Sequence, residues 1–320
     1  MGTFIIRRLL ISLVLLFVIS VISFAILKLT PGGSQLWFQL NPKISQAAKE
    51  NFIRKYHLDR PLYEQYYFIM TDLFGGRLLS SKDARPVIGK IGERLPATLR
   101  LNLVALLLEF GFGIPWGVYA ARNWNMWKDR FGTFWAFVFI AMPNFWISYV
   151  ICIFLVKYVN VAILGTSSFG VIYANPMEGF LDHFWHLLIP GTVLAIGGIA
   201  SMSRYVRAST LETLGEDYIR TARAKGLDPT TVFYKHALRN SLRPVITMVG
   251  YLLPALLGAS VIVESIFAYP GMGRLGWEAL TERDYPVLVT LNLVGAVLVL
   301  IGNLIADVLY AVVDPRIRLE

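Results

Sequence analysis

The sequence has almost no cysteine and few charged residues for its length. Its 320 residues include one cysteine, Cys152, so an internal disulfide framework and a cysteine-rich metal site are excluded. Only 16% of the residues are charged, whereas soluble domains average about 25%. Hydrophobic residues make up 56%, and the mean hydropathy is +0.56. Scarce charge combined with abundant apolar residues indicates a protein solvated by a lipid bilayer, rather than one with a large soluble core.

Several signatures of chemistry are also missing. There is no Gly-x-x-x-x-Gly-Lys-Ser/Thr sequence, so the chain does not bind ATP through a P-loop. There is no His-Glu-x-x-His and no Gly-x-Ser-x-Gly, which argues against an intramembrane enzyme. His183 and His186 stand near Asp182, but the neighbouring Phe184 and Trp185 favour an interfacial aromatic belt over a metal site. We therefore expect no catalytic residue, no metal and no cofactor on this chain.

Six apolar stretches are long enough to cross a hydrocarbon core of about 30 Å, which takes roughly 20 helical residues. They lie near Leu9–Leu27, Leu101–Ala121, Phe131–Val156, Phe184–Ser203, Pro244–Phe267 and Val287–Val313. The first follows Arg7 and Arg8 and could be a signal peptide. Its apolar run exceeds the usual length of about 7–15 residues, so we expect it to stay uncleaved. The sequence thus predicts an all-α membrane protein with six transmembrane helices.

The basic residues lie mainly in short segments beside the apolar spans. The formal net charge of +9 could suggest nucleic acid binding, but this placement is the one that the positive-inside rule expects. Segment 204–243 alone holds eight basic and four acidic residues. We predict a multi-pass protein of a prokaryotic plasma (inner) membrane, with both termini in the cytoplasm.

The predicted spans divide the chain into four parts. These are a first transmembrane helix at 1–29, an extracytoplasmic insert at 30–96, a five-helix core at 97–313 with a cytoplasmic hairpin at 212–243, and a cytoplasmic tail at 314–320.

Prolines and acidic residues interrupt the apolar spans. A different proline lies in each of four spans: Pro115, Pro143, Pro190 and Pro254. A proline removes a backbone hydrogen bond, so it fits either ordinary bundle packing or a kinked core that lines a pathway. An acid within a membrane is costly and is a functional candidate by default. We take Glu109, Pro143 and Glu264 as candidate pathway or gate residues. For Glu264, the alternative is a structural hydrogen bond or a salt bridge to a partner.

The segment between the fourth and fifth spans predicts a helix, a turn and a second helix. The acidic pair Glu216–Asp217 suits a helix N-terminus, and the basic residues of Arg223–Lys225 suit its C-terminus. Gly226 is placed as the left-handed residue that ends this helix. In Asp228–Pro229, the aspartate can cap the next helix and the proline can open it. The hairpin is either an ordinary capped loop or a docking element for a cytosolic partner.

The same segment resembles the EAA loop of binding-protein-dependent ABC importer permeases. It reads YIRTARAKGL at 218–227 and HALRNSLRP at 236–244, which is similar to the dipeptide, oligopeptide and nickel branch. The match to the general EAA pattern is partial, because Arg220, Thr221 and Ala222 stand at the Glu-Ala-Ala positions.

The resemblance covers nearly the whole chain. Further blocks similar to this branch are Arg7–Leu10, Leu29–Gly32, Leu58–Leu62, Glu93–Leu99, Ala268–Leu275, Arg283–Val287 and Asp314–Arg318. Two places depart from it. Leu73–Ser80 replaces the family's usual Gly-Asp-(Leu/Phe)-Gly-x-Ser block, and the loop Asn160–Asp182 matches no family block. Both departures are on the side where substrate enters, so they leave the substrate open.

The resemblance implies a MetI-like fold and a set of partners. These are a second homologous permease subunit, two ATP-binding subunits that hold ATP and magnesium, and an extracytoplasmic substrate-binding protein. It also implies that the hairpin couples to an ATPase, through Glu216, Asp217, Tyr218, Arg220, Thr221, Ala222, Arg223, Ala224, Lys225 and Gly226. The expected cargo is a di- or oligopeptide, with an oligosaccharide or nickel as alternatives. An ion-gradient-driven secondary transporter is the alternative class, but it leaves the cytoplasmic hairpin unexplained.

Overall fold

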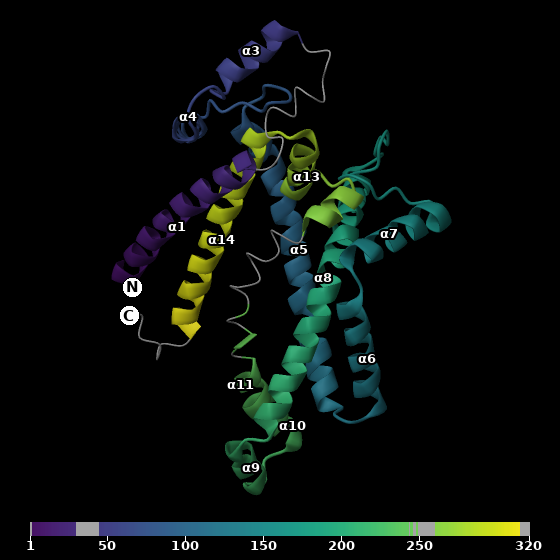
Figure 1. The fold of residues 1–320 in the computed structure, drawn as a ribbon. Coiled ribbons are helices and arrows are strands. Elements are labelled where there is room, and N and C mark those ends of the chain that lie inside the picture. Colours follow the sequence, from purple (N-terminus) through teal and green to yellow (C-terminus); the bar gives the residue numbers. More distant parts are fainter. Residues whose placement is uncertain (1, 30–44, 243, 246–247, 249–259, 314–320) are drawn as a thin grey trace. The chain divides into compact units, whose positions relative to one another are not determined.

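The structure is a computed structural model that describes residues 2–29, 45–242, 244–245, 248 and 260–313. In these residues the secondary structure is helical, apart from one isolated bridge between Leu79 and Pro86 (Figure 1). The α-helices are α1 (Gly2–Leu29), α3 (Gln46–Lys55), α4 (Leu62–Phe74), α5 (Val87–Arg122), α6 (Trp127–Ala141), α7 (Asn144–Phe154), α8 (Pro176–Leu214), α9 (Asp217–Ala224), α10 (Pro229–Thr231), α11 (Arg239–Ser241), α13 (Met272–Glu282) and α14 (Tyr285–Val313). Two π-helical segments, η1 (Leu155–Val159) and η2 (Val232–Leu238), continue α7 and α10.

Four of the six predicted spans fall on long apolar helices. The membrane-crossing candidates among the described residues are Ile6–Ile26 of α1, all of α5, all of α8, and Tyr285–Ile305 of α14. These correspond to the first, second, fourth and sixth predicted spans. The helices α5 and α8 are longer than predicted, because polar turns at their ends continue the helix beyond the apolar run.

The third predicted span is not one straight helix. The chain breaks between α6 and α7, and the two helical arms are bent by 98°. Met142 is extended, with ψ 124°, because the residue before a proline is disfavoured in the helical region. Pro143 then opens α7 with no backbone N–H to give. The prediction of a single crossing over Phe131–Val156 is therefore corrected to a helix pair broken at Pro143.

The fifth predicted span, Pro244–Phe267, lies mostly outside the described residues, as does Pro254. Its C-terminal part is described as a helical run over residues 260–266.

The described chain groups into two compact units. One draws on residues up to Pro96 together with Gly271–Leu304, and the other draws mainly on Ala97–Pro270. The first unit thus combines the predicted insert with α13 and most of α14, which had been predicted to belong to the core. The reason is a shared apolar cluster, in which Leu73, Leu78 and Val87 pack with Met272 and Leu275.

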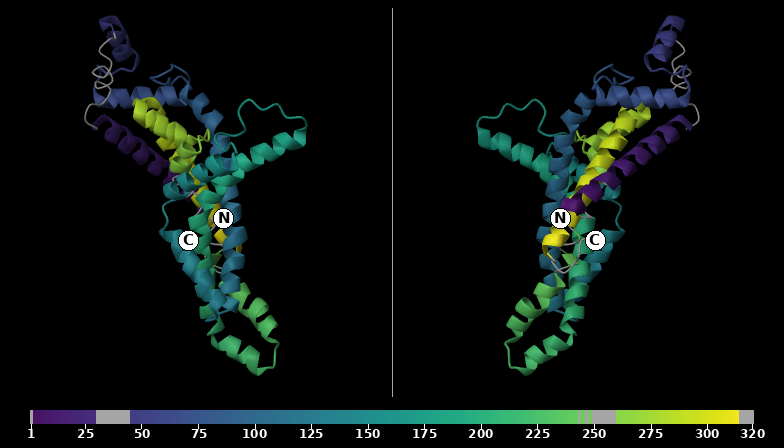
Figure 2. Two further views of the ribbon diagram at one scale, coloured as in Figure 1. Left: turned by 90° about the vertical axis from the view of Figure 1, so that its right-hand side faces the viewer. Right: turned by 90° about the vertical axis from the view of Figure 1, so that its left-hand side faces the viewer.

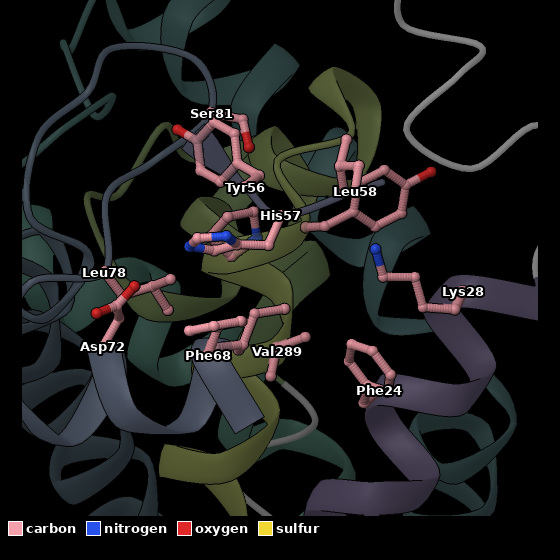
Figure 3. Close-up of a pocket in the computed structure, with 13 residues that line it drawn as sticks. Phe24, Lys28, Tyr56, His57, Leu58, Phe68, Asp72, Leu78, Ser81 and Val289 are labelled. Carbon is pink, nitrogen blue, oxygen red and sulfur yellow. The ribbon is translucent and has the colours of Figure 1, made fainter. Parts of the chain in front are cut away.

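In the first unit, polar contacts join α1 to α4. Ser20 Oγ lies 2.6 Å from Tyr66 Oη, and Lys28 Nζ donates to Gln65 Oε1 at 2.6 Å. Beside them is a small, largely apolar cavity, with Lys28 at its edge and the His57 ring inside it (Figure 3).

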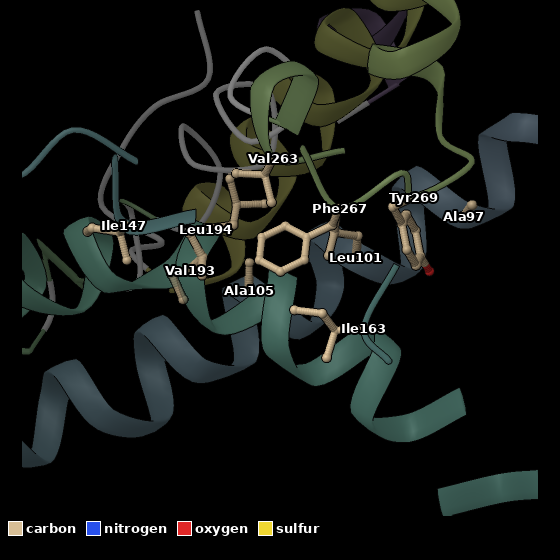
Figure 4. Close-up of a cluster of buried hydrophobic side chains, with 11 residues drawn as sticks. Ala97, Leu101, Ala105, Ile147, Ile163, Val193, Leu194, Val263, Phe267 and Tyr269 are labelled. Carbon is tan, nitrogen blue, oxygen red and sulfur yellow. The ribbon is translucent and has the colours of Figure 1, made fainter. Parts of the chain in front are cut away.

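In the second unit, α5 and α8 lie in very close contact. A Cβ atom at Gly117 would lie 2.5 Å from the Ser203 carbonyl oxygen, and one at Gly113 would lie 2.8 Å from Met202 Cβ. Glycine is therefore required at both positions for this approach. Closer to the N-terminal end of α5 than this contact, Phe267 is fully buried among Leu101, Ile163 and other apolar side chains (Figure 4). The loop between η1 and α8 joins this cluster through the Gly165 N–H, which donates to the Phe267 carbonyl at 2.8 Å.

Candidate functional site

The hairpin predicted from the sequence is present, and its turns are set by local residues. It extends beyond the end of α8 in both views of Figure 2. Glu216 precedes α9 in extended conformation, and Gly226 ends the helix with a φ of +75°, where residues with a Cβ are strained. The Asp228 carboxylate accepts from the backbone N–H of Thr230 at 2.9 Å and of Thr231 at 3.2 Å. The predicted cap, turn and cap are all confirmed.

The hairpin has a small apolar core of its own. Ile219 and Ala222 of α9 pack against Val232 and Ala237 of η2, and each of these side chains is at most 7% exposed. Across the same contact, the Asn240 amide donates to Tyr218 Oη at 3.0 Å. The two arms therefore form a folded unit rather than an open loop.

One face of α9 is exposed. Nine of the ten predicted coupling residues are exposed on the hairpin surface: Glu216, Asp217, Tyr218, Arg220, Thr221, Arg223, Ala224, Lys225 and Gly226. The structure corrects the tenth. Ala222 is buried in the hairpin core, so it supports the exposed face from beneath and does not belong to it. Arg220 and Asp217 form a highly exposed ion pair at 3.1 Å, which contributes little to stability.

The hairpin is fastened to the end of α8 by hydroxyl groups. Ser209 Oγ donates to the Ser241 carbonyl at 3.0 Å, and Thr210 Oγ1 lies 3.1 Å from Ser241 Oγ. Thr210 and Ser241 are almost completely buried. Because Ser209 and Thr210 are adjacent, both contacts join the returning arm to one point on α8.

A buried ion pair then joins α8 to α6. Arg207 Nε donates to Asp129 Oδ1 at 2.6 Å, and Arg207 Nη2 donates to Oδ2 at 2.8 Å. The Asn125 N–H donates to the same carboxylate at 3.0 Å. Asp129 is 2% exposed, so its charge is balanced almost entirely inside the protein. The sequence does not indicate this contact, because Arg207 is 78 residues away from Asp129.

The three predicted pathway residues all belong to the second unit. Glu264 is fully buried, and Thr98 Oγ1 donates to its Oε1 at 2.8 Å. Glu109 is also buried, and its carboxylate packs on Gly198, where an added Cβ would lie 2.4 Å from Oε2. Pro143 marks the break between α6 and α7. The structure thus gives Glu264 the structural hydrogen bond that was its alternative interpretation.

Two polar groups near Glu264 were missed by sequence reasoning. Asn102 lies one turn along α5 from Thr98, and Ser260 lies four residues before Glu264. Both are buried, and within the described part of the chain neither side chain has a hydrogen-bond partner. Asparagine and serine within apolar runs are the only sequence signal that could have found them.

A second polar network lies in the first unit. Asp284 accepts from Ser80 Oγ, and its other carboxylate oxygen accepts from the Ser81 N–H at 3.0 Å. Lys90 Nζ donates to Ser80 Oγ at 3.2 Å and pairs with Asp83 at 3.1 Å. The loop between α4 and α5 is thereby tied to the start of α14, over a separation of 204 residues.

Electrostatics within this loop favour an ionised Asp83. Burial by itself would raise the pKa of Asp83, but hydrogen bonds from Ser80, Lys90 and the Arg85 N–H outweigh it and lower the pKa to about 2. Among the described residues there is no cluster of three histidine, cysteine, aspartate or glutamate side chains that could hold a metal ion.

Comparison with known proteins places this architecture in a family. Residues 113–319 match the family model described as "Binding-protein-dependent transport system inner membrane component", and residues 1–102 match the model of its N-terminal part. The chain belongs to this family. It is therefore a multi-pass membrane component of a transport system that depends on a binding protein, and it is not an enzyme.

Relatives in this family match the chain along its full length. The oligopeptide transport system permease protein AppB of Bacillus subtilis (strain 168) is 43% identical over 99% of this chain and 100% of the relative. The dipeptide transport system permease protein DppB of Escherichia coli (strain K12) is 33% identical over 99% of both chains. The glutathione transport system permease protein GsiC of Shigella flexneri serotype 5b is 34% identical over 99% of both.

A solved structure of the MetNI methionine ABC transporter, described as inward facing, contains a chain of similar fold. The TM-score is 0.54 and the sequence identity is 18%, over 72% of this chain and 99% of that one. The predicted all-α, MetI-like permease fold is confirmed.

Proposed function

We propose that this chain forms half of the translocation pathway of an ATP-driven importer of di- or oligopeptides. The observation that carries the proposal is full-length similarity to permeases named for oligopeptide, dipeptide and glutathione transport. Glutathione is itself a short peptide, so the three names share one chemical class. Nothing in these relatives favours an oligosaccharide, nickel or an ion-gradient-driven mechanism.

The proposed partners follow from the hairpin and the family. A second homologous permease subunit completes the pathway, two ATP-binding subunits hold ATP and magnesium, and an external binding protein delivers the peptide. Both termini lie in the cytoplasm, so that the hairpin of residues 212–243 faces the ATPases. The similarity of the hairpin sequence to the EAA loop of importer permeases and the exposed face of α9 support this arrangement.

The hairpin couples ATP hydrolysis to movement of the membrane helices. An ATPase dimer that closes on ATP can shift the permease only if it contacts α9 differently in its two states. The hairpin is joined to α8 through Ser241, and α8 is joined to α6 through Arg207. A displacement of α9 by the ATPase would therefore be transmitted to these two membrane helices. Pathway roles for Glu109, Pro143 and Glu264 stay predictions.

The test is capture of the tagged chain from its native membrane in mild detergent, with mass spectrometry of what co-purifies. Peptide uptake is measured in reconstituted vesicles with and without ATP. Thr221→Trp adds bulk to the exposed face of α9, and Lys128→Trp is the matched control at an exposed position in the first turn of α6. We expect a second permease and P-loop ATPases with the native chain and the control, and loss of the ATPases with Thr221→Trp. A chain that purifies alone and transports without ATP would overturn the proposal.

A further inference from the structure

Two cavities at the end of α5 share one arginine. One, of about 470 Å³, is lined by Arg122, Trp124 and Arg223, with apolar side chains from α8 and η2. The other, of about 550 Å³, is lined by Pro115, Val118, Tyr119, Arg122, Asn123 and Tyr234. All these lining residues are described by the structure, and none is acidic. The cavities are therefore positively charged where they meet.

Arg122 is held in a fixed position between the two cavities. Its Nη1 donates to Tyr234 Oη at 2.9 Å, and its guanidinium carbon lies 5.5 Å from the centre of the Tyr234 ring. A guanidinium has five N–H donors in a rigid plane, so this contact uses one and leaves a donor edge suited to a phosphate. Arg223, on the exposed side of α9, adds a second positive charge to the same cavity.

The second cavity continues from Arg122 into the membrane-spanning part of α5. Pro115, Val118, Tyr119 and Arg122 have the spacing of one helix face, and Arg122 is the last residue of α5. The surface therefore changes from charged to apolar along the helix. Tyr119 is 50% exposed and Trp124 is 63% exposed, as is typical of aromatic residues at a membrane interface.

We propose that this pair of cavities binds one anionic phospholipid. Its phosphate lies between Arg122 and Arg223, and an acyl chain follows α5 past Val118 and Pro115. Basic cavities between membrane helices are known to hold anionic headgroups. An ATPase does not fit as well, because a soluble subunit cannot occupy a cavity that runs along an apolar span. If the hairpin faces the cytoplasm, as the proposed function requires, this lipid belongs to the cytoplasmic leaflet; the binding site itself does not rest on the proposed function.

The test is retention of phosphatidylglycerol by the purified transporter complex. The complex is washed in detergent containing phosphatidylcholine, and the bound lipid is counted by native mass spectrometry. We expect the native complex to keep phosphatidylglycerol, and Arg122→Gln to keep about tenfold less, since it loses a charged hydrogen-bonding group. Arg130→Gln is the matched control, because Arg130 is an exposed arginine on the same side that lines neither cavity. Val118→Trp, which fills the second cavity, is expected to reduce retention as well.

Three outcomes would overturn the site. The first is that Arg122→Gln keeps as much phosphatidylglycerol as the native complex, and the second is that Arg130→Gln loses as much as Arg122→Gln. The third is that the native complex keeps phosphatidylcholine as well as it keeps phosphatidylglycerol. Displacement by soluble glycerol phosphate as readily as by a short-chain phosphatidylglycerol would show a phosphate site without a lipid. Loss of the ATPases in Arg122→Gln with lipid unchanged would assign the surface to the ATPase. If Arg122→Gln does not assemble, Arg122→Lys is used, and it is expected to keep an intermediate amount.

Discussion

At the scale of single residues, Asp129 and Glu264, two of the buried acids of the second unit, are balanced by different means. Asp129 is paired with the Arg207 guanidinium through two hydrogen bonds, whereas Glu264 accepts from the Thr98 hydroxyl. A charge buried this deeply is tolerated when its partners stay in place, and it becomes costly when one of them is removed. The Asp129–Arg207 pair therefore fixes how α8 sits on α6.

Asp129→Asn is expected to lower the thermal unfolding temperature of the purified complex. The free energy of unfolding is expected to fall by about 2–4 kcal/mol. This is less than for a fully buried ion pair, because the Arg207 side chain is 26% exposed. The unfolding temperature is measured by intrinsic fluorescence during heating. The double variant Asp129→Leu with Arg207→Met removes both charges and is expected to regain most of the stability. A double variant as unstable as Asp129→Asn would show that the pair is not the cause.

At the scale of elements, the hairpin separates residues that support α9 from residues that face outward. Ala222 and Ala224 are two positions apart on the same short helix, yet Ala222 is buried and Ala224 is exposed. A sequence pattern of small residues does not distinguish them, because the direction of each side chain is set by packing against η2.

Exchanging each alanine for leucine tests this separation. Ala222→Leu overfills the core formed with Ile219, Val232 and Ala237, so hydrogen exchange of the hairpin amides is expected to rise. Ala224→Leu is expected to leave that exchange unchanged while reducing capture of the ATPases. Hydrogen–deuterium exchange with mass spectrometry measures the first effect. Equal exchange in the two variants would mean that Ala222 has no special role in the hairpin core.

The elements also show what could be predicted from the sequence. The caps and turn of the hairpin were predictable, because Asp228 and Gly226 act on neighbouring backbone groups. The size of the break at Pro143 was harder to predict, because a proline inside a membrane helix is compatible with a mild kink and with the observed bend of 98°. The contacts of Asp129 and Asp284 could not be predicted, because their partners are 78 and 204 residues away and carry no pattern in common.

At the scale of the whole molecule, the first unit is closed by contacts between its two distant parts of the chain. Leu73–Val87 on one side and Met272–Val287 on the other share one apolar cluster and the polar network around Asp284. The acidic members of that network make the folding of this unit depend on pH.

The pKa of Asp83 sets the pH range over which the first unit is expected to lose stability. A carboxyl whose pKa is lower in the folded state stabilises that state above its unfolded pKa of about 3.9. For Asp83 this contribution is lost as the pH falls from about 4 toward its folded pKa of about 2. We expect proteolysis of the loop between α4 and α5 by pepsin to increase over this range. Asp83→Asn should flatten the part of the change that is due to this residue, and an unaltered pH profile in the variant would contradict the assignment.

The continuous helix α8 has a consequence for how this protein can change over evolutionary time. Its 39 residues extend about 58 Å, and the hairpin is attached at its last turns. Each residue added or removed between Pro190 and Ser209 would shift the hairpin by about 1.5 Å and rotate it by about 100°. A single deletion there would turn the face of α9 away from any subunit that it meets. The number of residues in this stretch is therefore under tighter constraint than their identity, and insertions are tolerated only in the loops at either end.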